Sequence, residues 1–212
     1  MTEKKRSGKL VVFEGLAGVG KTTLASELEK ILPQAVFLRE PGGTPFGEAM
    51  RRAVQGLIMA EYSIHPVAAF FAFSASRANL VHEVILPHLE EGKIVFLDRY
   101  WFSGFAYQGG GEGIDYDFIV AVSEVATSKL MPDAVLYLDF DIVGAMGRKE
   151  GCSDVDRYDR KELFFHEQVR DGYILLSEMY PDIWHTIDAD KAKEEVLAEA
   201  LEVLEEMGLL SC

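Results

Sequence analysis

One glycine-rich segment near the N-terminus limits the possible folds of this chain more than any other feature. Residues 15–22, Gly-Leu-Ala-Gly-Val-Gly-Lys-Thr, fit the pattern G-x-x-x-x-G-K-[ST]. A strand-like run, residues 9–14, precedes them, and a helix-like run, "KTTLASELEKIL", continues from them. In this pattern the glycines let successive backbone N–H groups point at phosphate oxygens. The segment therefore predicts a nucleoside triphosphate site in an α/β fold.

The chemistry of the pattern assigns roles within this loop. Lys21, expected on an exposed edge of the loop, reaches the outer phosphates, and the hydroxyl of Thr22 can ligate Mg²⁺. The positive end of the following helix points at the same place. The residues expected to bind the triphosphate are Gly15, Leu16, Ala17, Gly18, Val19, Gly20, Lys21, Thr22 and Thr23.

Strand-like and helix-like runs alternate along the rest of the chain. Strands are expected at 35–40, 93–98, 134–140 and 185–189, and helices at 47–57, 65–89, 116–129, 161–179 and 191–207. Residues 109–113, Gly-Gly-Gly-Glu-Gly, are expected to form a loop, and residues 146–159 show no clean period. The alternation predicts a P-loop NTPase fold, with a five-stranded parallel sheet and helices on both faces. We expect a single domain over residues 1–212, with a short lid at about 146–160.

Composition excludes several kinds of partner. The net charge of −14 at pH 7 argues against a general nucleic-acid-binding surface. The longest stretch without Asp, Glu, Lys or Arg, residues 62–76, is too short and too polar to span a bilayer. Cys152 and Cys212 do not make a disulfide framework or a zinc site, which suits a reducing cytosol. We therefore expect a cytoplasmic protein that binds neither nucleic acid nor membrane.

Four further stretches can assemble a second substrate site. They are "LREPGGTPFGEAMRR", "FAFSASR", "DRYWFSGFAYQGGG" and "GRKEGCSDVDRYDR". The first three follow or face the carboxyl ends of strands, where open α/β sheets bind ligands. Asp98 and Arg99 end a strand, so a carboxylate that can orient Mg²⁺-bound water lies beside a guanidinium that can bind phosphate. Phe73 and Arg77 are four residues apart and share one helix face.

Simpler interpretations of these residues stay open at this point. Asp98 and Arg99 could form a surface ion pair, and Phe73 could be a core residue. The charged segment 146–160 could be a solvated loop. A guanine-binding N-K-x-D element is ruled out because Asn79 is the only asparagine, which weakens the case for a GTPase switch.

Taken together, the motifs resemble the thymidylate kinase family nearly end to end. The resemblance rests on the FEGL-type loop, "REPGGTP", the Phe and Arg of "FAFSASR", "DRYWFSGFAYQGGG", "PDAVLYLD", and the "DR" and "FF" of the last third. It implies transfer of the γ-phosphoryl group of ATP to dTMP, with Mg²⁺ as cofactor. It also implies a homodimer, for which Val67, Ala68 and Phe71 are candidate interface residues.

The resemblance further implies which residues act on the phosphates. Asp98 would lie by the metal together with Thr22, and Arg99 would grip the acceptor phosphate. Because no side chain at positions 16–19 is basic, an arginine of the lid would have to cover the transferred phosphoryl group. The residues implied in catalysis are Lys21, Asp98, Arg99, Arg148, Arg157 and Arg160, with Arg148 also binding ATP.

Roles on the acceptor side are implied in the same way. Phe73 would stack under thymine, and Arg77 would donate to its O4. Tyr107 and Gln108 would contact the sugar and the base edge. The further residues implied to line this site are Arg39, Glu40, Arg51 and Ser103.

Ala17 departs from the family pattern. Family loops usually carry Asp or Glu there, implied to hold the 3′-hydroxyl of the acceptor sugar or to act near the metal. Glu14 and Glu40 are candidates to replace this carboxylate. Three activities therefore stay open: a dTMP kinase, a kinase for another nucleotide or a deoxynucleoside, and a nucleotide-binding protein with weak catalysis.

Overall fold

A parallel sheet runs through the centre of the computed structural model, which describes residues 6–55, 64–149 and 155–210. Its strand order is β2-β3-β1-β4-β5. The strands are β1 Lys9–Glu14, β2 Val36–Arg39, β3 Ile94–Asp98, β4 Ala134–Asp139 and β5 Trp184–Asp188. Each pair of neighbours is parallel. The predicted five-stranded parallel sheet is confirmed.

The strands are covered on both faces, which explains their nearly continuous apolar sequences. β1 is buried from Leu10 to Glu14. Three rings from neighbouring strands stack across one face: Phe96 lies 5.6 Å from Phe13 and 4.7 Å from Phe37 between centroids. This packing holds the carboxyl ends of β1 and β3 in fixed relation.

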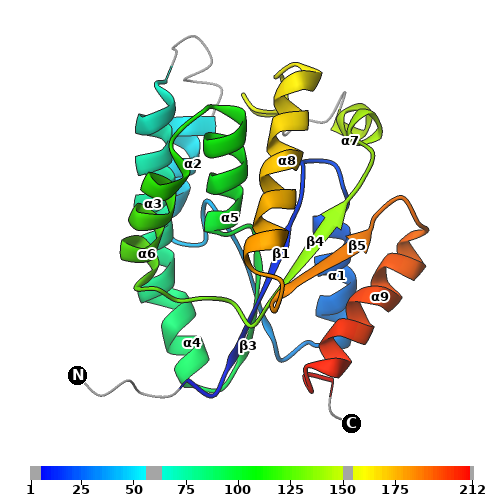
Figure 1. The fold of residues 1–212 in the computed structure, drawn as a ribbon. Coiled ribbons are helices and arrows are strands. Elements are labelled where there is room, and N and C mark those ends of the chain that lie inside the picture. The colour runs from blue at the N-terminus through cyan, green and yellow to red at the C-terminus, as the bar shows by residue number, and fades with distance from the viewer. Residues whose placement is uncertain (1–5, 56–63, 150–154, 211–212) are drawn as a thin grey trace.

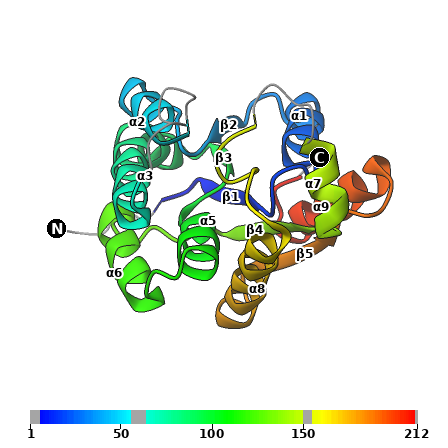
Figure 2. The same cartoon turned by 90° about the horizontal axis from the view of Figure 1, so that it is seen from above.

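Helices form a layer on each side of the sheet. α1 (Lys21–Ile31) and α9 (Lys193–Glu206) pack together on one face (Figure 2). The other face carries α3, α5, α6 and α8 (Figures 1 and 2). The bounds of the remaining elements are α2 Pro45–Gln55, α3 Pro66–Leu80, η2 Val81–Ile85, α4 Leu86–Glu90, α5 Trp101–Gly104, η3 Phe105–Gly111, α6 Tyr116–Thr127, α7 Ile142–Lys149 and α8 Leu163–Met179.

The helix expected at 65–89 is present as three consecutive helical elements without a break, α3, η2 and α4. Its middle, η2, is a wider π-helical turn that ends where the N–H of Leu86 donates to the carbonyl of Val81. The next residue, Pro87, has no N–H to continue the α-helical ladder, which accounts for the irregular turn.

The loop expected at residues 109–113 is wrong for its first three glycines. Gly109, Gly110 and Gly111 belong to η3, a π-helical continuation of α5. A Cβ at Gly109 would collide with the ring of Tyr116, and one at Gly111 with the ring of Phe165. These glycines therefore serve close packing between helices, not a turn.

Residues 146–149 are also more regular than expected, because they complete α7. Asp141 begins this helix, since its carboxylate accepts from the N–H of Gly144 at 2.7 Å. Ala145 is buried against the phosphate-binding loop, where a Cβ on Gly18 would collide with its carbonyl oxygen. Cys152, Cys212 and residues 56–57 lie outside the described residues. Within the described ranges, every helix is too short or too polar to cross a membrane.

Candidate active site

The phosphate-binding loop joins β1 to α1 at the carboxyl edge of the sheet (Figure 1). Gly15, Gly18 and Gly20 have φ angles of 136°, 83° and 104°, conformations that favour glycine. Gly20 precedes α1, and no side chain of the described residues caps this helix. The first N–H groups of α1 are therefore available to an anion.

Lys21 is buried, with 6% of its surface exposed, so the expected exposed edge is wrong. The loop wraps around its side chain, and Nζ donates to the carbonyls of Gly15 at 3.1 Å and Leu16 at 2.7 Å. Burial and then the charge of Arg99 lower the pKa of Lys21 to about 7, while Asp98 raises it. An ammonium desolvated in this way gains strongly from a phosphate partner.

Asp98 and Arg99 lie beside this loop because β3 is hydrogen-bonded next to β1, with Phe13 opposite Asp98. Arg99 has a φ of 71°, in the left-handed region, which costs a non-glycine residue about 1–3 kcal/mol. Its Nη1 donates to the carbonyl of Gly15 and to Ser103 Oγ, both at 3.0 Å. Oδ1 of Asp98 is buried and has no hydrogen-bond partner among the described residues. Strain and an unpartnered oxygen at one place are typical of a functional site.

Glu14 supports the segment that follows β3 through hydrogen bonds to its carboxylate. Its Oε1 accepts from the N–H groups of Tyr100 at 2.8 Å and Ser103 at 3.2 Å. Its Oε2 accepts from the hydroxyls of Ser103 at 2.6 Å and Tyr173 at 2.9 Å. Burial raises the pKa of Glu14, whereas Arg99 lowers it. With four donors on its oxygens, Glu14 is a structural support and not a free group for a sugar.

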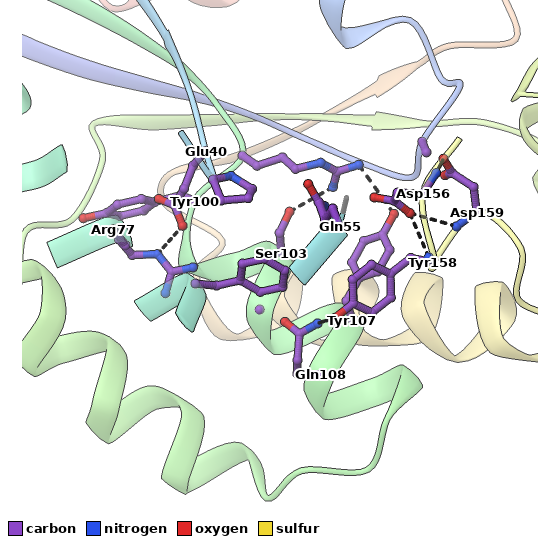
Figure 3. A pocket seen from close by; sticks show the side chains of 15 residues that line it. Glu40, Gln55, Arg77, Tyr100, Ser103, Tyr107, Gln108, Asp156, Tyr158 and Asp159 are labelled. Carbon is purple, nitrogen blue, oxygen red and sulfur yellow. Dashed lines mark hydrogen bonds and ion pairs between the residues drawn. The ribbon is translucent and has the colours of Figure 1, made fainter. Parts of the chain in front are cut away.

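A cavity opens next to the loop and contains about 520 Å³ of space, open solvent included (Figure 3). Its walls come from the turn after β2, from α3, from the segment after β3 and from residues 156–159. Figure 3 shows Arg77 at one end and Asp159 at the other. The expected substrate residues that line it are Glu40, Phe73, Arg77, Arg99, Ser103, Tyr107 and Gln108.

Arg77 and Glu40 form a buried ion pair at the inner end of this cavity. Arg77 Nε lies 2.5 Å from Glu40 Oε1, and both side chains are 2% exposed. Arg77 Nη1 and Glu40 Oε2 have no hydrogen-bond partners among the described residues. Burial raises the pKa of Glu40 to about 7, although Arg77 opposes this. Glu40 is thus committed to Arg77, whose remaining N–H groups can meet a ligand carbonyl.

Two arginines expected at the acceptor site lie outside the cavity lining. Arg39 donates to Glu48 at 3.1 Å, and its side chain is 56% exposed. Arg51 Nη1 donates to the carbonyl of Pro41 at 3.2 Å. Pro41 itself lines the cavity, so Arg51 borders it while Arg39 faces away.

The three lid arginines occupy different surroundings. Arg148 is on α7, and its guanidinium lies 3.8 Å from the ring centroid of Phe140, which follows β4. Arg157 Nη2 donates to Glu112 at 3.0 Å. Arg160 is exposed.

Three other residues of this segment were missed, although the sequence singled out the segment that holds them. Asp156, Tyr158 and Asp159 line the cavity together with Ala17. Asp159 also lies 3.5 Å from Lys149 Nζ, next to the phosphate-binding loop. The carboxylates of Asp156 and Asp159 therefore lie in the same cavity as Ala17, the loop position where the family pattern has a carboxylate. The sequence signal that could have identified these residues is "DRYD", residues 156–159.

The G-x-x-x-x-G-K-[ST] loop and Arg99 lie side by side, and Arg99 lines the cavity next to the loop. This geometry suits transfer of a phosphoryl group between two nucleotides, and it defines a nucleoside monophosphate kinase of the P-loop class.

The chain belongs to the thymidylate kinase family, whose sequence model matches residues 13–200. Over 206 residues it is 40% identical to the thymidylate kinase of Pelotomaculum thermopropionicum, covering 94% of each chain. It is 39% identical to that of a Thermoanaerobacter species, covering 93% of this chain and 97% of the relative. It is 36% identical to that of Deinococcus radiodurans, covering 95% and 98%.

Proposed function

We propose that this protein transfers the γ-phosphoryl group of ATP to dTMP, giving ADP and dTDP. The observation that carries the proposal is the unpartnered Nη1 of Arg77 in a cavity that also holds Phe73 and opens to Arg99. A directed guanidinium favours the O4 carbonyl of thymine over the amine of cytosine. The ring of Phe73 offers a stacking surface, and Arg99 binds the acceptor phosphate.

Positioning and charge stabilisation supply the catalysis in this proposal. Lys21 neutralises charge on the outer phosphates of ATP, and Arg99 holds the acceptor phosphate in line beside them. No general base is needed, because the second pKa of a phosphate monoester is about 6 and an oxygen is already ionised near neutral pH.

The residues at the loop fit Mg²⁺ as cofactor. Thr22 is the second residue of α1 and is exposed, and Asp98 offers a buried oxygen that has no hydrogen-bond partner among the described residues. Oxygen ligands of this kind, with several waters and phosphate oxygens, are what Mg²⁺ prefers. When bound, the ion would be held by Thr22 and Asp98 and would neutralise negative charge on the phosphates.

Arg148 is the lid arginine that we assign to ATP, because α7 packs directly on the phosphate-binding loop. We also propose a homodimer. The rings of Phe71 on α3 and Phe118 on α6 pack against each other and are 49% and 37% exposed, and a partner subunit would cover them. Sedimentation of the purified protein as a monomer at micromolar concentration would contradict the dimer.

A panel of phosphate acceptors tests the proposed function. We expect ATP-dependent turnover that is fastest with dTMP, slower with dUMP, and much slower with dCMP and thymidine. Faster turnover of another nucleotide or of a nucleoside would favour a kinase for that acceptor, and no turnover with any acceptor would favour a nucleotide-binding protein with weak catalysis. The measurement is the coupled release of ADP.

Arg77→Lys should lower this selectivity. The lysine keeps a charge for the buried Glu40 but lacks the second N–H group of the guanidinium. Loss of a charged hydrogen bond is worth about 1.5–3 kcal/mol, so the KM for dTMP should rise roughly ten- to a hundredfold. The KM for ATP should stay within about twofold. If both KM values rise equally, Arg77 does not face the base.

A further inference from the structure

Two contacts join the segment 155–160 to η3 and to the residue that follows it. Arg157 Nη2 donates to Glu112 Oε1 at 3.0 Å, and Gln108 Nε2 donates to the hydroxyl of Tyr158 at 3.1 Å. Gln108 belongs to η3 and Glu112 directly follows it, so adjacent residues of the segment contact the C-terminal end of one helix. Figure 3 shows the contact between Gln108 and Tyr158 at the cavity wall.

Tyr158 is the member of this segment that faces the base-binding side of the cavity. It is 4% exposed and lines the cavity. Its ring centroid lies 6.4 Å from that of Phe73 and 5.7 Å from that of Tyr107. Phe73 belongs to α3, so the cavity has one aromatic wall on the fixed core and a second on the segment 155–160.

Arg157 fixes the position of this second wall. Its guanidinium lies 4.9 Å from the ring centroid of Tyr158, within the range of a cation–π contact. The charge of Arg157 is balanced by Glu112, to which its Nη2 donates. Nη2 also donates to the carbonyl of Ile64 at 3.5 Å, and these contacts keep the guanidinium beside the ring.

Glu112 is well placed to set this geometry. Its side chain is 5% exposed, against 25% for Arg157. Burial raises the pKa of Glu112, while Arg157 lowers it. Such a pair contributes little net stability, but loss of one partner leaves the other charge uncompensated. The ion pair between Glu112 and Arg157 is therefore suited to fix the position of Arg157, and not to act on the phosphates.

We propose that Glu112 is a positioning residue: through Arg157 it holds Tyr158 as the aromatic wall that faces Phe73, and so sets the affinity for the acceptor nucleotide. The proposal rests on the proposed function in that the acceptor is a pyrimidine nucleotide. It gives Arg157 a role on the acceptor side, distinct from a contact with the transferred phosphoryl group.

Glu112→Gln and the charge-swapped variant Glu112→Arg/Arg157→Glu test this proposal. Glu112→Gln should raise the KM for dTMP about tenfold, with the kcat and the KM for ATP within about twofold. The swapped variant should not recover the loss, because it restores the ion pair but removes the guanidinium that contacts the ring of Tyr158. Glu91→Gln, which removes an exposed ion pair with Lys93 at the opposite edge of the sheet, is the control and should change nothing.

Hydrogen exchange provides a readout that needs no substrate. In Glu112→Gln the N–H groups of Tyr158 and Asp159, which both donate to Asp156, should exchange about tenfold faster than in the wild type. Unchanged exchange would overturn the proposal whatever the activity. A swapped variant with the KM of the wild type for dTMP would also overturn it, since the ion pair would then act without the contact to Tyr158, and so would equal rises in both KM values. Failure of the proposed function would instead appear as lack of dTMP turnover by the wild type.

Discussion

Lys21→Met should lower kcat/KM for ATP about a thousandfold, the effect expected when a preorganised donor is lost from a transferring phosphoryl group. Methionine keeps most of the volume of the buried side chain and removes only the charge. Lys30→Met, at the exposed far end of the same helix α1, is the matched control and should retain full activity. Near-normal turnover of Lys21→Met would refute the assignment of this loop to the triphosphate.

The same variant should be more stable than the wild type, and the difference should depend on pH. Burial lowers the pKa of Lys21 to about 7 in the folded state, from a usual value of 10.5. At and below pH 7 the wild type bears the full cost of a buried charge. Between pH 7 and about 10 the unfolded chain binds the extra proton, so wild-type stability rises with pH. The difference in Tm should therefore be largest near pH 7 and shrink toward pH 10.

Arg99→Ala is expected to have the second-largest effect, lowering kcat/KM for dTMP by about a hundred- to a thousandfold. The substitution removes the guanidinium that lies between the loop and the cavity, while the hydroxyls of Ser103 and Tyr173 still donate hydrogen bonds to Glu14. The fold should therefore persist, and the KM for ATP should change little.

Calorimetry with dTMP and thymidine separates a phosphate contact from a general loss of the cavity. Arg99→Ala should bind dTMP much more weakly than the wild type but should bind thymidine almost equally. Arg99→Lys must adopt the same backbone conformation, with a φ of 71°. It should recover part of the affinity, because it restores the charge but not the two parallel N–H groups of the guanidinium. Equal losses for both ligands would show that Arg99 does not contact the phosphate.

The fold was largely predictable from sequence because its strands are buried on both faces. Runs such as Leu10–Phe13 leave little room for another interpretation, and the observed strands begin and end within about one residue of those expected. The glycines at 109–111 were misread because their reason is tertiary: Tyr116 and Phe165 need the space that a Cβ would take. No local pattern carries that information.

The residues of the candidate site were predictable where one short motif contains them all. They were less predictable where two interacting residues lie far apart in the sequence. The loop and the Asp98–Arg99 pair are each contiguous, and parallel strand order brings them together. The burial of Lys21 depends on how the loop wraps around it. The pairing of Arg157 with Glu112 joins residues 45 positions apart, so sequence alone could not reveal it.

The pairing of β1 with β3 has a consequence for how such a protein can change its substrate. In the proposed function, two hydrogen-bonded backbones would set the spacing between the donor and acceptor phosphates, with Phe13 opposite Asp98. The base would be contacted elsewhere, by the cavity residues of α3 and of the segment 155–160. Acceptor choice can therefore be redesigned at Phe73, Arg77 or Tyr158 without disturbing the line of transfer. A one-residue deletion inside β3 would be far less tolerable, because it shifts the register and turns every following side chain to the opposite face.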